Sequence, residues 1–415
     1  MTHFRTSLNT VLSNRNLLAV TVTQSLSMFA MFLWRPFWGL YILELDGTKS
    51  ILGSLTALQS LSVLLAQLPG GVLSDRIGRK RVILAASVLG FLPPLFFRLS
   101  THWVMLVPGI LAFALSSLAT PALNALIADS LPRESRATGF GAYTMAYYLS
   151  IVASYPVGGY IMDRVGLVPG AHIGFTLSFL LTVPIVLIRW RFIEETVKPR
   201  QETADTPKLS LSPSQLRTVP TEIWKLVIVA ILSSFGFQLF WSFVVVYCVE
   251  EVGLSMLQWS YVSVIANLTG ACLMIPSGFL SDRVGRKRII ILSQFAVSTS
   301  SLGYILSSGF SGVALTRFMG GLGEGLGGNV MGATGGPVWQ ALVTEIAPAE
   351  TRGSILGLMG TLIGFLTTPA PILGGYLYEN ASPRLPFIAS FISGILGCLV
   401  FSLWVREPER TTREA

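Results

Sequence analysis

The sequence predicts an all-α integral membrane protein with twelve transmembrane helices, arranged as two homologous halves. The chain of 415 residues is 52% hydrophobic and only 12% charged, with a mean hydropathy of +0.64, whereas a soluble domain carries about 25% charged residues. Apolar stretches long enough to cross a bilayer recur along the whole chain. A densely charged segment also occurs twice, at residues 71–81 and 278–288, and each copy lies between two apolar stretches.

The apolar stretches define the expected helices in order. They fall near residues 17–45, 51–72, 82–99, 103–129, 138–162 and 171–192 in the first half, and near 223–249, 256–280, 289–308, 311–344, 353–377 and 385–405 in the second. The tenth stretch is too long for one straight crossing, so we expect it to break. The polar, proline-bearing residues 194–221 are expected to link a first half at residues 1–193 to a second at 222–415.

Basic residues are concentrated on one side of this expected topology. When both charged segments are placed in the cytoplasm, most of the 29 Lys and Arg residues fall at cytoplasmic positions. The outer loops hold Lys49, Arg98, Arg164 and Arg384. The positive-inside rule therefore predicts that both termini lie in the cytoplasm, below a plasma or inner membrane. The net charge of +8 needs no nucleic-acid partner to explain it.

Cysteine and histidine residues indicate neither a disulfide framework nor a metal site. Cys248, Cys272 and Cys398 lie in apolar stretches, where they suit packing. The three histidines fall near ends or loops and do not have the spacing of metal ligands. The sequence also lacks a nucleotide-binding Gly-Lys-Ser/Thr loop. We therefore expect no cofactor, no metal and no enzymatic reaction.

The duplication extends beyond the charged segments. Residues 121–129 align with residues 337–345, and the three residues Pro132, Glu134 and Arg136 recur as Pro348, Glu350 and Arg352. The offset has grown from 207 to 216, so the second half has gained nine residues in the Gly-rich stretch before Pro337. Duplicated multi-span architecture is typical of secondary transporters.

Both repeated elements resemble signatures of the major facilitator superfamily. Gly-x-Leu-Ser-Asp-Arg-x-Gly-Arg-Lys, between the second and third spans, is similar to the hallmark loop of that family, and here it occurs in both halves. The Asp/Glu-x-x-Pro-x-Glu-x-Arg run after the fourth and tenth spans is similar to a second family motif. The resemblance implies a monomer with two six-helix bundles that give alternating access to a central small-molecule site. The first, fourth, seventh and tenth helices would line that site.

Each charged segment is expected to form a tight cytoplasmic loop. A glycine would permit the turn, an earlier glycine would permit close helix approach, and the Asp would accept hydrogen bonds from a neighbouring helix N-terminus. The resemblance implies that the loop latches the cytoplasmic side, with Arg79 and Arg286 at the centre of each latch. The candidate latch residues are Gly71, Asp75, Arg76, Gly78, Arg79, Asp129 and Arg136, and their counterparts Gly278, Asp282, Arg283, Gly285, Arg286, Glu345 and Arg352. For the trailing cations of each segment, a role in setting the topology is the alternative.

Glu324 is the acidic residue expected deep in the membrane, because the other acids fall in loops or near span ends. It lies about 20 Å along the tenth helix, counted from residue 311. A charge at that depth costs at least ~2.5 kcal/mol, so the carboxyl group favours its neutral form and can exchange protons. Glu324 is the candidate for proton coupling. The alternative is a structural Glu held by a hydrogen bond or an ion pair.

Arg317 precedes Glu324 by seven residues, or two helical turns, so both can share one face. The run Arg317-x-x-x-Gly321-x-Gly323-x-Gly325 resembles a pattern that the family usually carries in its fourth span, whereas here it lies in the tenth. The glycines suit close packing and bending. Arg317 is a candidate for substrate binding, and snorkelling to the membrane surface is the alternative.

A stripe along the first helix supplies further candidates for a substrate cavity. Its members, at helical spacing, are Gln24, Met28, Met31 and Arg35. Pro36 predicts a kink beside Arg35. Arg35 is expected to bind substrate or to pair with Glu324, and snorkelling is again the alternative. The remaining cavity candidates are Ser234, Gln238 and Trp241 on the matching stripe of the seventh helix, and the repeat-equivalent Asn124 and Gln340.

Two elements resemble a signature of drug/proton antiporters. The fifth span ends with Pro156-Val-Gly158-Gly159 and the eleventh with Pro371-Ile-Leu-Gly374-Gly375. Both are similar to Gly-Pro-x-x-Gly-Gly, although both lack the leading Gly and the fifth is one residue short. A plain helix kink is the alternative.

The leading interpretation is a proton-coupled secondary transporter that exports small amphipathic compounds. Its partners would be the substrate, protons and the lipid bilayer. The alternative within transport is uptake or exchange of an organic anion, with Arg35 and Arg317 binding the negative group. A non-transporting membrane receptor is the remote alternative, and it would predict a degraded charged loop or an added soluble domain.

Overall fold

The computed structural model describes residues 14–131, 136–196, 219–328, 335–348 and 351–405, and this part of the chain is almost entirely helical. A helix satisfies its backbone N–H and C=O groups within the segment, as the bilayer interior requires. Within the described ranges, nine helical stretches are long and apolar enough to cross a membrane, and one bent pair would make a tenth. The predicted all-helical, multi-pass fold is therefore confirmed.

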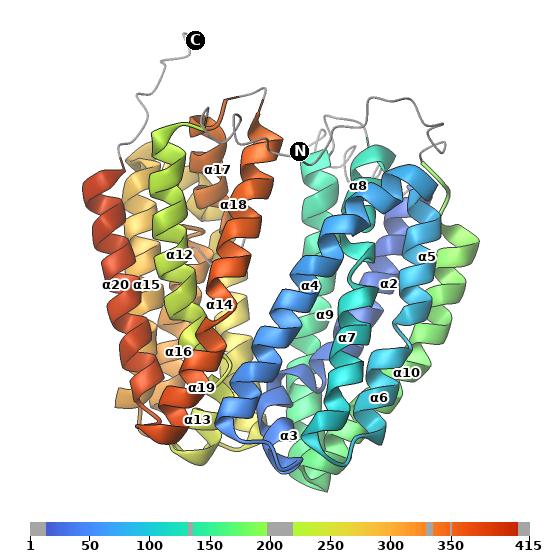
Figure 1. Ribbon diagram of the computed structural model, residues 1–415, viewed down its shortest axis with the longest axis horizontal. Helices are drawn as coiled ribbons and strands as arrows, with labels where there is room; N and C mark the ends of the chain where they lie inside the picture. Colours follow the sequence, from blue (N-terminus) through green and yellow to red (C-terminus); the bar gives the residue numbers. More distant parts are fainter. Residues whose placement is uncertain (1–13, 132–135, 197–218, 329–334, 349–350, 406–415) are drawn as a thin grey trace. The chain divides into compact units, whose positions relative to one another are not determined.

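The described helices follow the twelve predicted spans in order (Figure 1). Those of the first half are α2 (Arg15–Phe32), η1 (Arg35–Phe37), α3 (Trp38–Glu44), α4 (Lys49–Ile77), α5 (Arg79–Leu89), α6 (Leu92–Leu99), η2 (Trp103–Met105), α7 (Leu106–Ser116), α8 (Ala119–Ser130), α9 (Arg136–Val165) and α10 (Leu167–Phe192). Those of the second half are α12 (Thr221–Trp241), α13 (Val244–Glu250), α14 (Met256–Val284), α15 (Arg286–Leu306), α16 (Gly309–Gly325), α17 (Pro337–Ile346), α18 (Arg352–Thr367), α19 (Ala370–Asn380) and α20 (Leu385–Trp404). Most of the expected linker at 194–221 lies outside the described residues.

Several spans are broken where the sequence predicts a break. The first changes from α2 to a short 3-10 turn that contains Pro36, which confirms the predicted kink. The tenth is divided between α16 and α17, as its excess length predicts. The fifth stays continuous through Pro156, whereas the eleventh breaks just before Pro371. The helix is therefore not interrupted at Pro156, and the plain-kink alternative stays a prediction for the fifth span.

The described residues group into two compact units. The first contains those within 14–47, 58–196 and 255–260, and the second contains those within 48–57, 219–254 and 261–405. The first turns of α4 thus belong to the second unit, and the first turns of α14 to the first. In the first unit α2 packs against α9 and α10, and in the second α12 packs against α20.

Each unit has its own hydrophobic core, and the two cores use equivalent sequence positions. In the first, α5 packs with α8. In the second, α15 and α17 do the same. The equivalent pairs are Val82 with Ile289, Ile83 with Ile290, Leu126 with Leu342, and Ile127 with Val343. The duplication seen in the sequence therefore extends to buried packing.

The two Gly-Gly elements are close-packing sites in both units. A Cβ atom on Gly158 would overlap the carbonyl of Leu33 on the first span, and one on Gly374 would overlap the carbonyl of Leu239 on the seventh. The adjacent Gly375 lies against the first residues of α4 in the same way. Small residues at such contacts let helix backbones approach closely.

The same two spans also carry helix-capping carboxylates, which the sequence reading did not single out. Asp163 accepts hydrogen bonds from the backbone N–H of Met256 (2.9 Å) and Leu257 (3.1 Å) at the start of α14, within the first unit. Glu379 accepts one from the N–H of Ser50 (2.8 Å) near the start of α4, within the second. Carboxylates suit these positions because the first N–H groups of a helix lack intrahelical partners.

Candidate functional site

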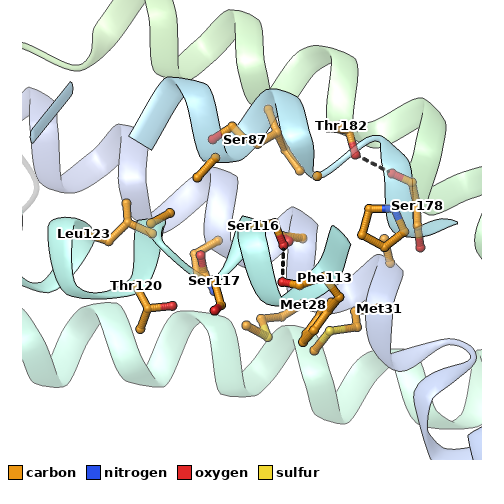
Figure 2. A pocket seen from close by; sticks show the side chains of 18 of the residues that line it. Met28, Met31, Ser87, Phe113, Ser116, Ser117, Thr120, Leu123, Ser178 and Thr182 are labelled. Carbon is orange, nitrogen blue, oxygen red and sulfur yellow. Dashed lines mark hydrogen bonds between the residues drawn. The ribbon is translucent and has the colours of Figure 1, made fainter. Parts of the chain in front are cut away.

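A cavity of about 260 Å³ lies inside the first unit, between α2, α5, α6, α7, α8, α9 and α10. Figure 2 shows Phe113 of α7 beside Met28 and Met31 of α2 on one wall. The polar wall includes Asn124 and several serine and threonine hydroxyls. The lining is therefore amphipathic, as sites for small organic ligands usually are.

Three of the predicted cavity residues on α2 do line this space, but the fourth does not. Gln24, Met28 and Met31 contribute to the wall, whereas Arg35 is not part of the lining. The stripe fails at Arg35 because α2 has ended by then and the chain has entered the 3-10 turn. The Arg35 guanidinium lies 5.7 Å from the ring centroid of Phe113, and its buried Nη1 has no hydrogen-bond partner within the described residues.

Arg189 of α10 is a lining residue that the sequence analysis did not single out. Its residue is 6% exposed. Its Nε donates to Thr23 Oγ1 (3.1 Å), Nη1 to Ser87 Oγ (2.7 Å) and Nη2 to Gln24 Oε1 (3.4 Å). The sequence does contain a sign of this burial, because Arg189 lies four residues before Ile193 and within the apolar run of the sixth span.

The second unit holds the other two charged candidates on α16. Arg317 is 5% exposed, lies 5.2 Å from the ring centroid of Trp241, and donates to the Tyr304 hydroxyl (3.5 Å). The snorkelling alternative is therefore wrong for Arg317, which points into the unit. Trp241 was itself predicted to face a cavity, and here it provides the face on which this cation rests.

Glu324 lies in the last turn of α16 and is half-buried. Within the described part of the chain, its carboxylate forms no hydrogen bond and no ion pair, although the charge of Arg317 acts on it electrostatically. The alternative that a hydrogen bond or salt bridge holds Glu324 finds no support among these residues. Arg35 belongs to the first unit and Glu324 to the second, so their expected pairing stays a prediction.

Glycines around Glu324 pack as predicted. A Cβ on Gly321 would lie 2.6 Å from the Ala266 carbonyl oxygen, and one on Gly325 would lie 2.7 Å from Leu273 Cβ, both on α14. On α15, Ser293 donates to the carbonyl of Gly323 at 2.6 Å. The end of α16 is thus tightly enclosed by its neighbours in the second unit.

The remaining polar candidates differ in their burial. Gln238 is half-buried on α12 and Ser234 is fully buried. Asn124 is exposed at the cavity wall, and the exposed Gln340 donates to the Gly335 carbonyl.

The first charged loop is organised around Arg79. Gly78 has φ = 101°, a backbone conformation that favours glycine. Arg79 forms an ion pair with Asp129 and donates to the Ala125 carbonyl (2.6 Å). Glu195, which the sequence analysis assigned to the linker, accepts from the N–H of Arg79 (2.9 Å) and that of Lys80 (3.1 Å). It therefore caps α5.

The second loop repeats this geometry in part. Gly285 has φ = 106°, and Arg286 pairs with Glu345 (2.7 Å) and more loosely with Asp282 (3.9 Å). The structure therefore pairs each central Arg with the acid expected from the matching position of its own unit, Asp129 or Glu345.

Other expectations for the loops are not met within the units. Neither Asp75 nor Asp282 accepts a hydrogen bond from a helix N-terminus within the described residues, and both are exposed. Their expected hydrogen bonds stay predictions. Close helix approach is not seen at Gly278, where a Cβ would meet nothing described within 4 Å, and a Cβ on Gly71 would touch only Pro121 at 4.0 Å.

The outer members of the candidate latch take no visible part in it. Arg76, Arg283 and Arg352 are exposed and form no ion pair with a described residue. The side chain of Arg136 lies outside the described residues.

A polytopic helical bundle with an internal amphipathic cavity and two repeated charged loops defines a membrane transporter. The family model described as Major Facilitator Superfamily matches residues 20–331 and 328–415, so the chain belongs to that superfamily. It is a transporter rather than an enzyme.

Two relatives illustrate the range of similarity. An uncharacterised MFS-type transporter of Methanocaldococcus jannaschii is 21% identical, with 92% of this chain and 94% of the relative covered. The quinolone resistance protein NorA of Staphylococcus aureus is 30% identical over 138 residues, which are 32% of each chain.

Solved structures of the superfamily have the same twelve-helix, two-domain fold. The nucleoside transporter NupG has a TM-score of 0.77 at 13% identity, with 93% of this chain and 98% of that chain covered. A bacterial homologue of the human lysosomal transporter Spinster has a TM-score of 0.71 at 16% identity, with 94% and 96% covered. At these identities the likeness concerns the fold alone.

Proposed function

We propose that the chain is a proton-coupled secondary transporter that exports small amphipathic compounds by alternating access. The observation that carries this proposal is the amphipathic cavity inside the first unit, where thioether and aromatic side chains face hydroxyl, amide and guanidinium groups. Such a lining accepts compounds that have an apolar body and a polar group. The partial similarity to NorA, a quinolone resistance protein, supports export.

Glu324 is our candidate for the coupling group. It lies near the break in the tenth span, in the last turn of α16, where the helix macrodipole disfavours negative charge. Within the membrane, a carboxyl group that alternates between neutral and charged forms can bias one conformation over the other. The nearby cation Arg317 would favour the charged form when the two approach.

The repeated loops are our candidates for a cytoplasmic latch. The ion pairs of Arg79 with Asp129 and of Arg286 with Glu345 support this role, because each ties the loop to the end of α8 or α17. The distribution of Lys and Arg supports cytoplasmic loops and termini.

Reconstituted protein tests the proposal directly. Proteoliposomes would carry an acid-inside pH gradient, and the external probes would be rhodamine 6G, coumarin and fluorescein, which are cationic, neutral and anionic at neutral pH. Antiport predicts that at least one probe accumulates inside, and that collapse of the gradient with an ionophore stops it. If the gradient has no effect on the flux of any probe, proton coupling is wrong.

Uptake or exchange of an organic anion is the second candidate. Arg189 and Arg35 favour it, because both are enclosed cations whose described neighbours include no paired carboxylate. The two directions are separated in energised cells, where uptake raises the cellular content of fluorescein and export lowers it.

A further inference from the structure

The acceptors around Arg189 are held in fixed orientations by the helices that carry them. The Thr23 hydroxyl donates to the Ala19 carbonyl (2.8 Å), and the Ser87 hydroxyl donates to the Ile83 carbonyl (2.5 Å). Each hydroxyl hydrogen is therefore committed, and the oxygen lone pairs are left for the guanidinium. This arrangement fixes the position of Arg189 before any ligand arrives.

The charge of Arg189 is nevertheless not neutralised by an acidic side chain among the described residues. Its three acceptors are two hydroxyls and one amide, and it forms no ion pair with a described residue. A guanidinium carries five N–H donors, so one N–H on each of Nη1 and Nη2 remains. Arg189 is also the sole charged residue among the described residues that line the cavity.

A purely structural role does not account for this cation. The second unit has the same scaffold, and Ile193 and Val405 end the last helices at equivalent core positions. Arg189 lies four residues before Ile193, and Phe401 lies four residues before Val405, so Phe401 occupies the position of Arg189 in the second unit. The offset of 207 residues between the charged segments likewise makes Gln294 the counterpart of Ser87. The scaffold therefore packs without a cation at this point, and a buried charge is costly unless something neutralises it.

We propose that the cavity binds the carboxylate of an amphipathic acid through the free Nη1 and Nη2 donors of Arg189. The planar guanidinium fork matches a carboxylate. The apolar body of the acid would lie on the wall formed by Met28, Met31 and Phe113. The inference deepens the proposed function and rests on it in one respect, namely that this cavity is part of the substrate path.

Binding to the purified full-length protein tests the proposal with three probes that share one ring system: 2-naphthoate, 2-naphthamide and 2-naphthylmethylamine. We expect 2-naphthoate to bind at least about tenfold more tightly than the amide, as a charge-assisted pair requires. Arg189→Gln should remove that preference. Arg191→Gln, an equal charge change at an exposed position two residues on, should keep it.

A second variant works even if Arg189→Gln does not fold. Gln24→Glu places a carboxylate where the amide oxygen now lies, 3.4 Å from Nη2. It should weaken 2-naphthoate binding about tenfold or more, weaken 2-naphthamide binding by a smaller factor so that the preference for the carboxylate falls, and keep or raise the thermal stability. A merely structural Arg189 would leave the preference between the two probes unaltered.

The proposal is overturned if 2-naphthoate does not bind, if the amide binds equally well, or if the preference survives both variants. The proteoliposome flux assay distinguishes failure of this binding proposal from failure of the proposed proton-coupled transport. Arg189-dependent binding of 2-naphthoate without proton-driven flux would defeat the proposed function and leave this inference standing. Proton-driven flux with no carboxylate preference would do the reverse.

Discussion

The two halves share their tight turns, ion pairs, glycine contacts and helix caps, and they differ in the polar and charged residues of their interiors. Both have a glycine at positive φ before the third helix of the half, and both have an Arg from the charged loop paired with an acid. Both also have a close-packed Gly-Gly element and a carboxylate that caps a helix start. Duplication has preserved the contacts that both units use in their packing, their charged loops and their helix starts.

The interior residues have diverged. Arg189 and Ser87 of the first half correspond to Phe401 and Gln294 of the second, and the Gln294 amide atoms have no hydrogen-bond partner within the described residues. Conversely, α16 carries Arg317 and Glu324, while α7, which occupies the matching span, has no charged residue. A charged side chain that occurs in only one of the two halves is therefore one that the shared scaffold does not require.

The largest expected effect on stability comes from the Gly-Gly elements. Gly158→Ala and Gly374→Ala each force a Cβ against a helix carbonyl, so each should lower the free energy of unfolding by about 1–3 kcal/mol. Thermal unfolding of the purified variants measures this cost. Gly278→Ala is the matched control, because its Cβ would meet nothing described within 4 Å, and no loss of stability there is expected. Equal losses at all three sites would refute the packing account.

A smaller effect is expected at the charged loops. Asp129→Asn should slow flux roughly tenfold, because Arg79 is 11% exposed at its side chain and loses a charged partner. Glu345→Gln should slow it less, since that carboxylate is 47% exposed and water screens the pair.

Asp75→Asn is the control for the loop variants. The sequence predicts that Asp75 accepts hydrogen bonds from a helix N-terminus, but it is exposed and accepts no such bond in the described part. Its flux should therefore stay near wild type. Initial rates that rank Asp75→Asn below Asp129→Asn would contradict the pairing seen here.

The smallest effect is expected at the two helix caps. Asp163→Ala removes the acceptor of two backbone N–H groups, and Glu379→Ala that of one. Loss of a cap costs about 0.5–2 kcal/mol, so hydrogen exchange at Met256 and Leu257 should speed up roughly 2- to 30-fold in Asp163→Ala. The exposed Glu251 supplies the control, Glu251→Ala. Unchanged exchange in both cap variants would mean that the caps contribute nothing.

The sequence predicted the fold well because hydropathy and duplication record it directly. Twelve apolar spans, the break at Pro36 and the turn at Gly78 each follow from one local property. Repeat arithmetic could also have found the caps, since Asp163 and Glu379 lie 216 residues apart, as do the aligned ends of the fourth and tenth spans.

The interior of the site was harder to predict, because burial near a helix end depends on tertiary packing. Arg189 and Arg191 both lie at the end of the sixth apolar span, yet Arg189 is enclosed by α2 and α5 and Arg191 is exposed. Arg35 left its predicted stripe because the backbone changed helix type before reaching it. Hydropathy cannot separate a cation that turns inward from one that turns outward.

The most direct test of the division between shared machinery and unshared chemistry is Glu324→Gln in proteoliposomes. The variant mimics the protonated acid, so it should exchange substrate across the membrane without a gradient yet fail to accumulate it under an acid-inside gradient. Glu345→Gln, an acid of the shared machinery, should slow both processes and still reach the wild-type accumulation ratio. Wild-type accumulation by Glu324→Gln would contradict the account and make Glu324 a structural residue.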